Sequence, residues 1–185
     1  MTEHGAVSGG TAGLVAAARA GGRRGPPPVH LWDPPDCGAI DIVIRRDGTW
    51  IHEGTPIGRP GLVRLFASIL RLEGDRHFLV TPVEKVAIEV EDAPFVAVDF
   101  DATEDAITFT TNVGDIVTAG PDHPIRVEAG ADGAPAPYVE VRRGLRALID
   151  RKSFYRLAEI AHEEGGMMGV RSGGAFFPIG PAEPG

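Results

Sequence analysis

The chain has 185 residues, of which 43% are hydrophobic, and its formal net charge is −8. This length accommodates one domain or two small ones with a buried core, and the negative charge excludes non-specific binding to the nucleic-acid backbone. Cys37 is the single cysteine, so an intrachain disulfide is excluded, and the lack of a long apolar run or a secretory signal predicts a cytoplasmic protein without membrane association.

The first structured segment is expected after an N-terminal tail. Residues 1–28 are rich in glycine and alanine and end in three prolines, which is typical of a disordered segment with at most a short helical stretch. Apolar and polar residues then alternate over residues 40–46, which indicates a strand. Asp47-Gly48 is a typical two-residue hairpin turn, and residues 49–52 are predicted to return as the second strand.

The first main helix is predicted to begin at Pro60, because the first turn of a helix does not need the missing proline N–H. Apolar residues follow at helical spacing as far as Leu70, and Gly74 is expected to end the helix. Strands joined by short connections, and therefore mostly antiparallel, are predicted between residues 77 and 128.

The C-terminal part is predicted to repeat this order. Residues 138–142 and 145–149 indicate a hairpin, and an amphipathic helix is expected from 152 to 164. Residues 167–171 and 175–179 indicate a final hairpin.

A short motif occurs twice, 92 residues apart. Residues 57–65 and 149–157 share the pattern Ile-x-Arg-x-x-apolar-apolar-Arg-Leu. Such self-similarity indicates an internal duplication. We therefore expect an α+β fold made of two tandem related units, mostly antiparallel with one main helix each, over residues 29–82 and 83–185.

Several motifs resemble, in order, those of a bacterial, proteobacterial domain-of-unknown-function family over about residues 30–180. They are Trp50-x-His52-x-Gly54-x-Pro56-Ile57-x-Arg59, Thr81-Pro82-Val83-Glu84-Lys85, Asp92-Ala93-Pro94-Phe95, Phe109-Thr110-Thr111-Asn112, Asp122-His123-Pro124 and Ser172-Gly173-Gly174-Ala175-Phe176-Phe177-Pro178. The resemblance implies a duplicated α+β core whose C-terminal half is loosely similar to a pleckstrin-homology fold. It also implies a role in signalling or stress response, with a nucleotide-like ligand between the domains.

The repeated arginines are the first candidate ligand-binding residues. Arg59 and Arg151 are predicted to lie at the starts of the two main helices. Arg64 lies five residues after Arg59, and Arg156 lies five residues after Arg151. Guanidinium groups at a helix N-terminus suit a phosphate or carboxylate. The alternative is structural ion pairs with the many acidic residues of the chain, such as those in residues 89–105.

Two further candidates are aromatic or imidazole groups. Trp50 and His52 are predicted to lie on one face of a strand, where they could stack on and hydrogen-bond a planar group. The alternative is a core tryptophan beside a hydrogen-bonded histidine. His123 follows Asp122 in a predicted turn and contacts a ligand only if it faces the groove.

Three function hypotheses remain open from the sequence. The first is a non-enzymatic binding or regulatory protein for a small anionic, nucleotide-derived ligand in the groove between the repeats. The second is a hydrolase-like enzyme that uses His52 or His123 as a general base with a carboxylate. The third is a protein-interaction module, including a homodimer through exposed strand edges. No residue pattern indicates a metal site or a cofactor.

Overall fold

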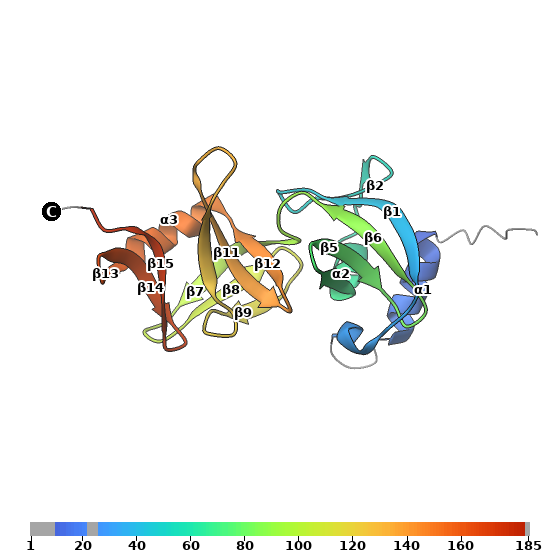
Figure 1. The fold of residues 1–185 in the computed structure, drawn as a ribbon, viewed down its shortest axis with the longest axis horizontal. Coiled ribbons are helices and arrows are strands. Elements are labelled where there is room, and N and C mark those ends of the chain that lie inside the picture. Colours follow the sequence, from blue (N-terminus) through green and yellow to red (C-terminus); the bar gives the residue numbers. More distant parts are fainter. Residues whose placement is uncertain (1–9, 22–25, 184–185) are drawn as a thin grey trace, which may run out of the picture. The chain divides into compact units, whose positions relative to one another are not determined.

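A computed structural model describes residues 10–21 and 26–183 and has a mixed α+β architecture (Figure 1). The chain divides into two compact units. Among the described residues, the first unit contains those up to Val43 together with Trp50–Glu89, and the second contains Ile44–Thr49 and those from Val90 onward. Within the described part of the chain, no helix has the length and apolar character needed to cross a membrane.

The first unit is built on a six-stranded sheet with the order β3-β2-β1-β6-β5-β4. Its strands are β1 (Asp36–Ile44), β2 (Trp50–His52), β3 (Thr55–Pro56), β4 (Leu70–Glu73), β5 (Arg76–Val80) and β6 (Lys85–Val90). Asp47-Gly48 forms the predicted turn between β1 and β2, with Gly48 at a φ of +90°, which favours glycine.

Helices complete the first unit. They are α1 (Thr11–Gly21), the short 3₁₀ helix η1 (Val29–Leu31) and α2 (Pro60–Ser68). The core of this unit contains Trp50, which stacks on Phe66 of α2 with ring centroids 6.2 Å apart. Leu14 of α1 is fully buried, and α1 packs against α2.

The second unit contains a six-stranded and a three-stranded sheet. Its elements are β7 (Phe95–Ala102), β8 (Ile107–Thr111), β9 (Ile116–Thr118), β10 (Ile125–Ala129), β11 (Pro135–Arg142), β12 (Leu145–Ile149), α3 (Arg151–Ile160), β13 (His162–Glu164), β14 (Met167–Ser172) and β15 (Ala175–Pro181). The predicted final hairpin is confirmed as β14 and β15.

The two six-stranded sheets have the same topology. The second sheet has the order β10-β11-β12-β7-β8-β9. Read from the β9 edge, this order is equivalent, strand by strand, to the order of the first sheet. In each sheet two antiparallel three-stranded meanders meet at a central pair. In the second sheet the central pair is β7 and β12, which are parallel. In the first sheet it is β1 and β6, where backbone hydrogen bonds from Lys85 to Pro35 and from Glu91 to Ile44 also indicate parallel strands. Two similar tandem units are therefore confirmed.

The repeated sequence motif, however, does not mark equivalent positions in these units. Helix α2 connects the third and fourth strands of the first sheet, whereas α3 follows the sixth strand of the second. The prediction that each motif copy marks the start of a helix is confirmed, since Arg59 is the N-cap of α2 and Arg151 is the first residue of α3. The inference that the two copies are equivalent parts of a duplication is wrong. The pleckstrin-homology likeness of the C-terminal half stays a prediction.

Both main helices are shorter than predicted. The first ends at Ser68, and Leu70–Glu73 form strand β4, so Gly74 lies in the β4–β5 turn instead of ending the helix. The second ends at Ile160, and His162–Glu164 pair with β14. In both places the residues after the helix gain cross-strand hydrogen bonds, which outweigh the helical apolar spacing.

The predicted domain division also changes. Strand β6 lies between β1 and β5 in the first sheet, so the boundary lies close to residue 90 and not after residue 82. Residues 11–21 of the predicted disordered tail form α1, because Leu14 and Ala18 are buried. Residues 1–9 and 22–25 of that tail lie outside the described residues.

Candidate functional site

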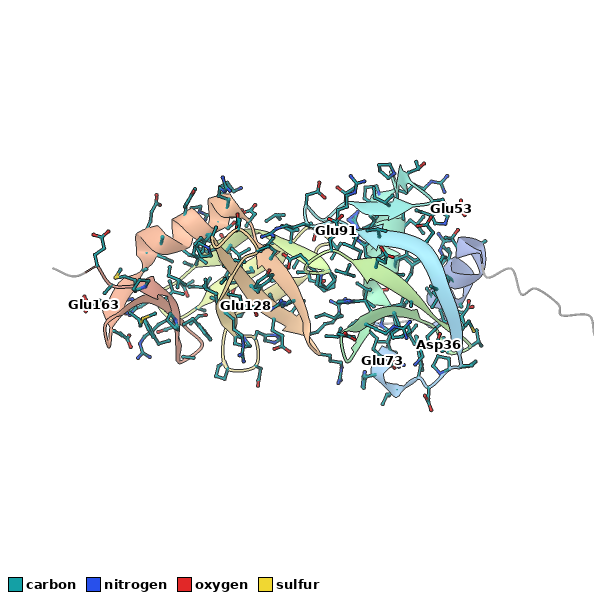
Figure 2. The ribbon with its side chains drawn as sticks, turned by 45° about the horizontal axis from the view of Figure 1, so that its top comes forward. Asp36, Glu53, Glu73, Glu91, Glu128 and Glu163 are labelled. Atoms are coloured by element: carbon teal, nitrogen blue, oxygen red, sulfur yellow. The ribbon has the colours of Figure 1, made fainter. Side chains whose placement is uncertain are left out.

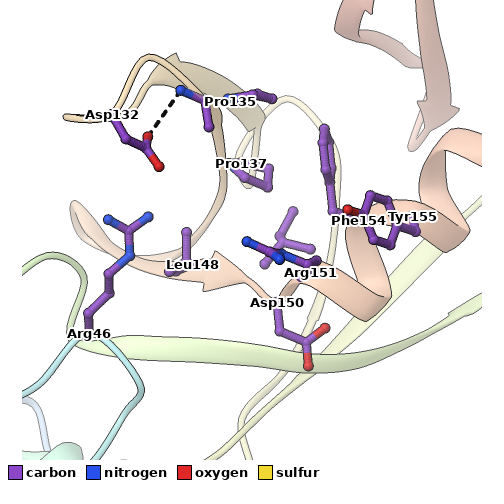
Figure 3. A pocket seen from close by; sticks show the side chains of 11 residues that line it. Arg46, Asp132, Pro135, Pro137, Leu148, Asp150, Arg151, Phe154 and Tyr155 are labelled. Atoms are coloured by element: carbon purple, nitrogen blue, oxygen red, sulfur yellow. Dashed lines mark hydrogen bonds between the residues drawn. The ribbon is translucent and has the colours of Figure 1, made fainter.

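The second unit contains a cavity of about 410 Å³ between its sheet, its loops and the start of α3 (Figure 3). Four parts of the chain contribute to it: the β1–β2 turn, the β10–β11 hairpin, β12 and the first residues around α3. The lining residues are Arg46, Asp132, Ala134, Pro135, Pro137, Leu148, Ile149, Asp150, Arg151, Phe154 and Tyr155.

Asp150 fixes the start of α3 beside this cavity. It is the N-cap residue, with an extended backbone, and its Oδ1 accepts a hydrogen bond from the Ser153 N–H at 2.8 Å. A carboxylate in this position satisfies one of the free N–H groups at the helix start. Figure 3 shows the Asp150 carboxylate directed away from Pro137 and Phe154, so it serves the helix and not the cavity.

Two guanidinium groups carry positive charge into the cavity. Arg151, the first residue of α3, is exposed and has no ion pair or side-chain hydrogen bond with any described residue. The Arg46 side chain is 55% exposed, and its Nε lies 3.7 Å from Oδ2 of Asp92. That separation is an ion pair without a direct hydrogen bond, so the donors of both arginines remain available.

A carboxylate faces the same space from the β10–β11 hairpin. One oxygen of Asp132, Oδ1, accepts the Ala134 N–H at 3.0 Å, and Figure 3 shows the group on the side of the cavity to which Arg46 points. This bond stabilises the hairpin turn, because short polar side chains hydrogen-bond the backbone two residues on. The remaining oxygen of Asp132 can accept another donor.

Asp92 connects Arg46 to the buried residue Tyr138. Oδ1 of Asp92 accepts the Tyr138 hydroxyl at 2.7 Å. Burial, together with this hydrogen bond to a carboxylate, raises the pKa of Tyr138 to about 12. The guanidinium of Arg146 lies 3.9 Å above the Tyr138 ring and also lines a second, smaller cavity of about 170 Å³.

Of the candidates in the first unit, Trp50 does not present a binding surface. Its side chain is 1% exposed, so its ring contributes to the core. His52 is half-buried, and Arg59 and Arg64 are exposed. Arg59 is the N-cap residue of α2 and makes no side-chain capping bond.

Of the candidates in the second unit, Arg151 alone lines a cavity named above. Arg156 pairs with Asp99, donates to the Phe100 carbonyl at 3.0 Å and covers the Phe100 ring. Arg156 also holds the pKa of Asp99 below its usual value. Nδ1 of His123 lies 3.1 Å from the backbone carbonyl of Glu140. Arg156 therefore forms the structural ion pair that was the alternative to ligand binding, whereas Arg151 does not.

Sequence reasoning missed Arg46, Asp132 and Tyr155 as cavity residues. The hairpin signal Asp47-Gly48 placed Arg46 at the end of a strand, but the turn reaches a cavity formed by residues more than 80 positions later in the chain.

Acidic side chains elsewhere project from both units. Those labelled in Figure 2 are Asp36, Glu53, Glu73, Glu91, Glu128 and Glu163. Among the described residues, no three His, Cys, Asp or Glu side chains are grouped to bind a metal ion.

Comparisons with known proteins agree with the fold. Residues 27–93 match the family description "Domain of unknown function (DUF1285), N-terminal domain", and residues 94–179 match "Protein of unknown function (DUF1285), C-terminal domain". This division, after residue 93, lies close to the boundary between the two units. No curated protein matches the chain.

Two solved structures are similar to the chain. A DUF1285 family protein from Silicibacter pomeroyi DSS-3 is 58% identical, with a TM-score of 0.86 over 92% of this chain and 96% of that one. A DUF1285 family protein from Shewanella baltica OS155 is 31% identical, with a TM-score of 0.52 over 64% of this chain and 90% of that one.

Proposed function

This chain belongs to the DUF1285 family, and we propose that it is a non-enzymatic binding protein whose second unit takes a small anionic, nucleotide-derived ligand. The cavity beside the start of α3 supports this proposal, because it presents two guanidinium groups next to an apolar wall. A binding protein of this kind would act as a regulatory component in signal transduction or stress response.

The observation that carries the proposal is the unpaired Arg151. In a chain with a net charge of −8, acidic side chains are abundant, yet none of the described ones pairs with this guanidinium. Arginine donors suit the planar oxygens of phosphate and carboxylate, and cations at a helix start are stabilised by a nearby anion. Arg156, which has a carboxylate partner, shows what a structural arginine looks like in the same helix.

The rest of the lining suits the body of such a ligand. Pro137, Leu148 and Phe154 form an apolar wall, and Tyr155 is exposed beside it. Figure 3 shows the Phe154 and Tyr155 rings at the end of the cavity where α3 begins. An aromatic ring exposed beside a cation can stack on a base, a contact that tolerates different bases. A volume of about 410 Å³ is within the range of small-molecule sites.

No observation favours the hydrolase hypothesis over this one. The His123 ring nitrogen contacts a backbone carbonyl, and His52 has no hydrogen-bond partner among the described side chains. Glu164 does contact His162 at 2.8 Å, but this pair lines neither of the two cavities.

The hypothesis of a protein-interaction module stays a prediction. Edge strand β9 exposes 73% of Ile116, and sedimentation of the purified chain tests the homodimer.

The test is calorimetric titration of the full chain with adenine and guanine nucleotides. We expect Arg151→Gln to weaken binding by about tenfold or more, because a lost hydrogen bond to a charged group costs about 1.5–3 kcal/mol. Lys152→Gln is the matched control, since it removes the same charge from the next residue of α3 but lies outside the cavity lining. The proposal fails if no nucleotide binds the wild type, or if both variants bind as the wild type does.

A further inference from the structure

We infer that the ligand of this cavity carries one negative charge and at least one hydrogen-bond donor, as a cyclic nucleotide phosphodiester does, and that nucleotides with terminal phosphates fit it less well. This inference rests on the proposed function and deepens it. It follows from which charged groups face the cavity, from what they already bind, and from the backbone at its rim.

Three charged side chains face the cavity. Arg46 and Arg151 face it with two positive charges, and Asp132 faces it with one negative charge (Figure 3). Asp150 also lines the cavity, but its carboxylate caps α3 and is directed away. Asp92 lies 3.7 Å from Nε of Arg46 but is outside the lining and accepts the Tyr138 hydroxyl. The side chains that face the cavity therefore sum to one positive charge, which a monoanion neutralises.

A second negative charge on the ligand would bind at a cost. A phosphomonoester has a second pKa near 6, so a terminal phosphate carries about −1.5 to −2 at neutral pH. The excess would lie close to the Asp132 carboxylate, inside a chain whose net charge is already −8. Like charges at such short range repel strongly when solvent is partly excluded. The repulsion from Asp132 is stronger still for a polyphosphate, because it carries more negative charge. A phosphodiester carries one negative charge at any pH near neutral.

The cavity also offers a hydrogen-bond acceptor next to an apolar surface. The Ala134 N–H donates to Oδ1 of Asp132 only. The second carboxylate oxygen can therefore accept a hydrogen bond from a ligand hydroxyl or amino group. Pro135 and Pro137 line the same side and have no backbone N–H to offer. A ligand with a donor next to an apolar ring is therefore preferred there, as in a nucleoside with its hydroxyls and base.

The experiment compares four probes on the full chain by calorimetry at neutral pH and fixed ionic strength: 3′,5′-cyclic AMP, AMP, ATP and adenosine, together with the guanine forms. We expect a cyclic nucleotide to bind at least about tenfold more tightly than the corresponding monophosphate and triphosphate, and the neutral nucleoside to bind more weakly than the cyclic form. The Arg151→Gln variant should lose this preference for the charged probe over the nucleoside.

Asp132→Asn provides the sharper arm. The amide oxygen keeps the bond to Ala134, while the cavity gains one unit of positive charge, so the ratio of AMP to cyclic AMP affinity should rise about tenfold. Glu163→Gln is the matched control, because it removes the same charge from an exposed residue of β13 outside the cavity. Equal ratios in the two variants overturn the inference.

The remaining outcomes separate the inference from the proposed function. If AMP or ATP binds the wild type more tightly than the cyclic form and Arg151→Gln abolishes that binding, the proposed function stands and the single-charge inference falls. If none of the probes binds, the proposed function and the inference both fall.

Discussion

Asp92 and Tyr138 form a buried link between the cavity arginine Arg46 and the second sheet. The Tyr138 hydroxyl donates to one oxygen of Asp92, and the other oxygen lies 3.7 Å from Nε of Arg46 and has no hydrogen bond. A phenol in this position is favoured in its neutral form, both because it is buried and because it donates to a carboxylate. The ionisation of Tyr138 therefore reports on this link.

We expect the tyrosinate absorbance of Tyr138 to titrate at about pH 12, in a Tyr155→Phe background where no other tyrosine contributes. The folded-state pKa lies above the unfolded value near 10, so the stabilising contribution is fully present below pH 10 and is lost as the pH rises toward 12. Asp92→Asn should move the midpoint down toward 10. A midpoint near 10 in the parent chain would show that the link does not form.

The capping bond of Asp150 predicts a separate effect on stability. Asp150→Ala removes the acceptor for the Ser153 N–H and should lower the free energy of unfolding by about 1 kcal/mol. Asp150→Asn keeps an acceptor oxygen and is the control, with an expected loss of a few tenths of a kcal/mol. Urea denaturation measures both. Equal losses in the two variants would mean that the carboxylate charge, and not the cap, stabilises α3.

At the scale of elements, a buried hydroxyl helps to attach the β14–β15 hairpin to the second sheet, beside the backbone hydrogen bond from the Gly173 N–H to the Asp105 carbonyl. Oγ of Ser172 accepts from the Ile107 N–H at 2.8 Å and donates to the Ala119 carbonyl at 2.7 Å. We expect Ser172→Ala to lower the free energy of unfolding by about 2–4 kcal/mol, because each buried polar group left unpaired costs about 1–3 kcal/mol.

Ser68→Ala serves as the control for that prediction. The Ser68 hydroxyl donates only to the Leu65 carbonyl within α2 and is half-buried, so its loss should cost no more than about 1 kcal/mol. Chemical denaturation of both variants, followed by circular dichroism, gives the comparison. Similar losses in the two proteins would contradict an attachment role for Ser172.

The elements show where sequence patterns were sufficient and where they were not. Alternation over residues 40–46 predicted the last part of β1, and the Asp-Gly turn predicted the β1–β2 hairpin, because both signals depend on neighbouring residues alone. The sequence places Leu70 in a helix, because an apolar residue there fits helical spacing as well as it fits a strand. Only pairing with β5, which lies beyond the turn, decides between the two.

At the scale of the whole chain, the repeat is a repeat of sheet topology. The sequence motif suggested it, but the two motif copies fall at different points of the two units. Arg151 could be chosen from sequence because a helix start predicts an anion site. Arg46 and Asp132 could not, since each lies in a turn whose three-dimensional neighbours come from distant parts of the chain. The cavity is thus a product of tertiary structure, and local pattern supplies only Arg151 of the three charged side chains that face it.

The β1–β2 turn gives a last prediction, because it carries Arg46 and belongs to the second unit although its strands are in the first sheet. A Cβ at Gly48 would lie 2.6 Å from Nδ2 of Asn112, whose Oδ1 accepts the Val96 N–H. Gly48→Ala should therefore displace Asn112, weaken this bond and shift the turn. We expect ligand affinity to fall about tenfold together with a loss of stability.

Gly54→Ala is the matched control for the turn. Gly54 has a similarly positive φ of +78°, but a Cβ there would meet no atom within 4 Å. Both variants therefore carry the same kind of backbone strain, of about 1 kcal/mol, and the Gly48 variant alone carries the contact with Asn112. If calorimetry and denaturation give the same losses for both, the turn does not position Arg46. If affinity falls only in the Gly48 variant, the β1–β2 turn positions Arg46 at the cavity.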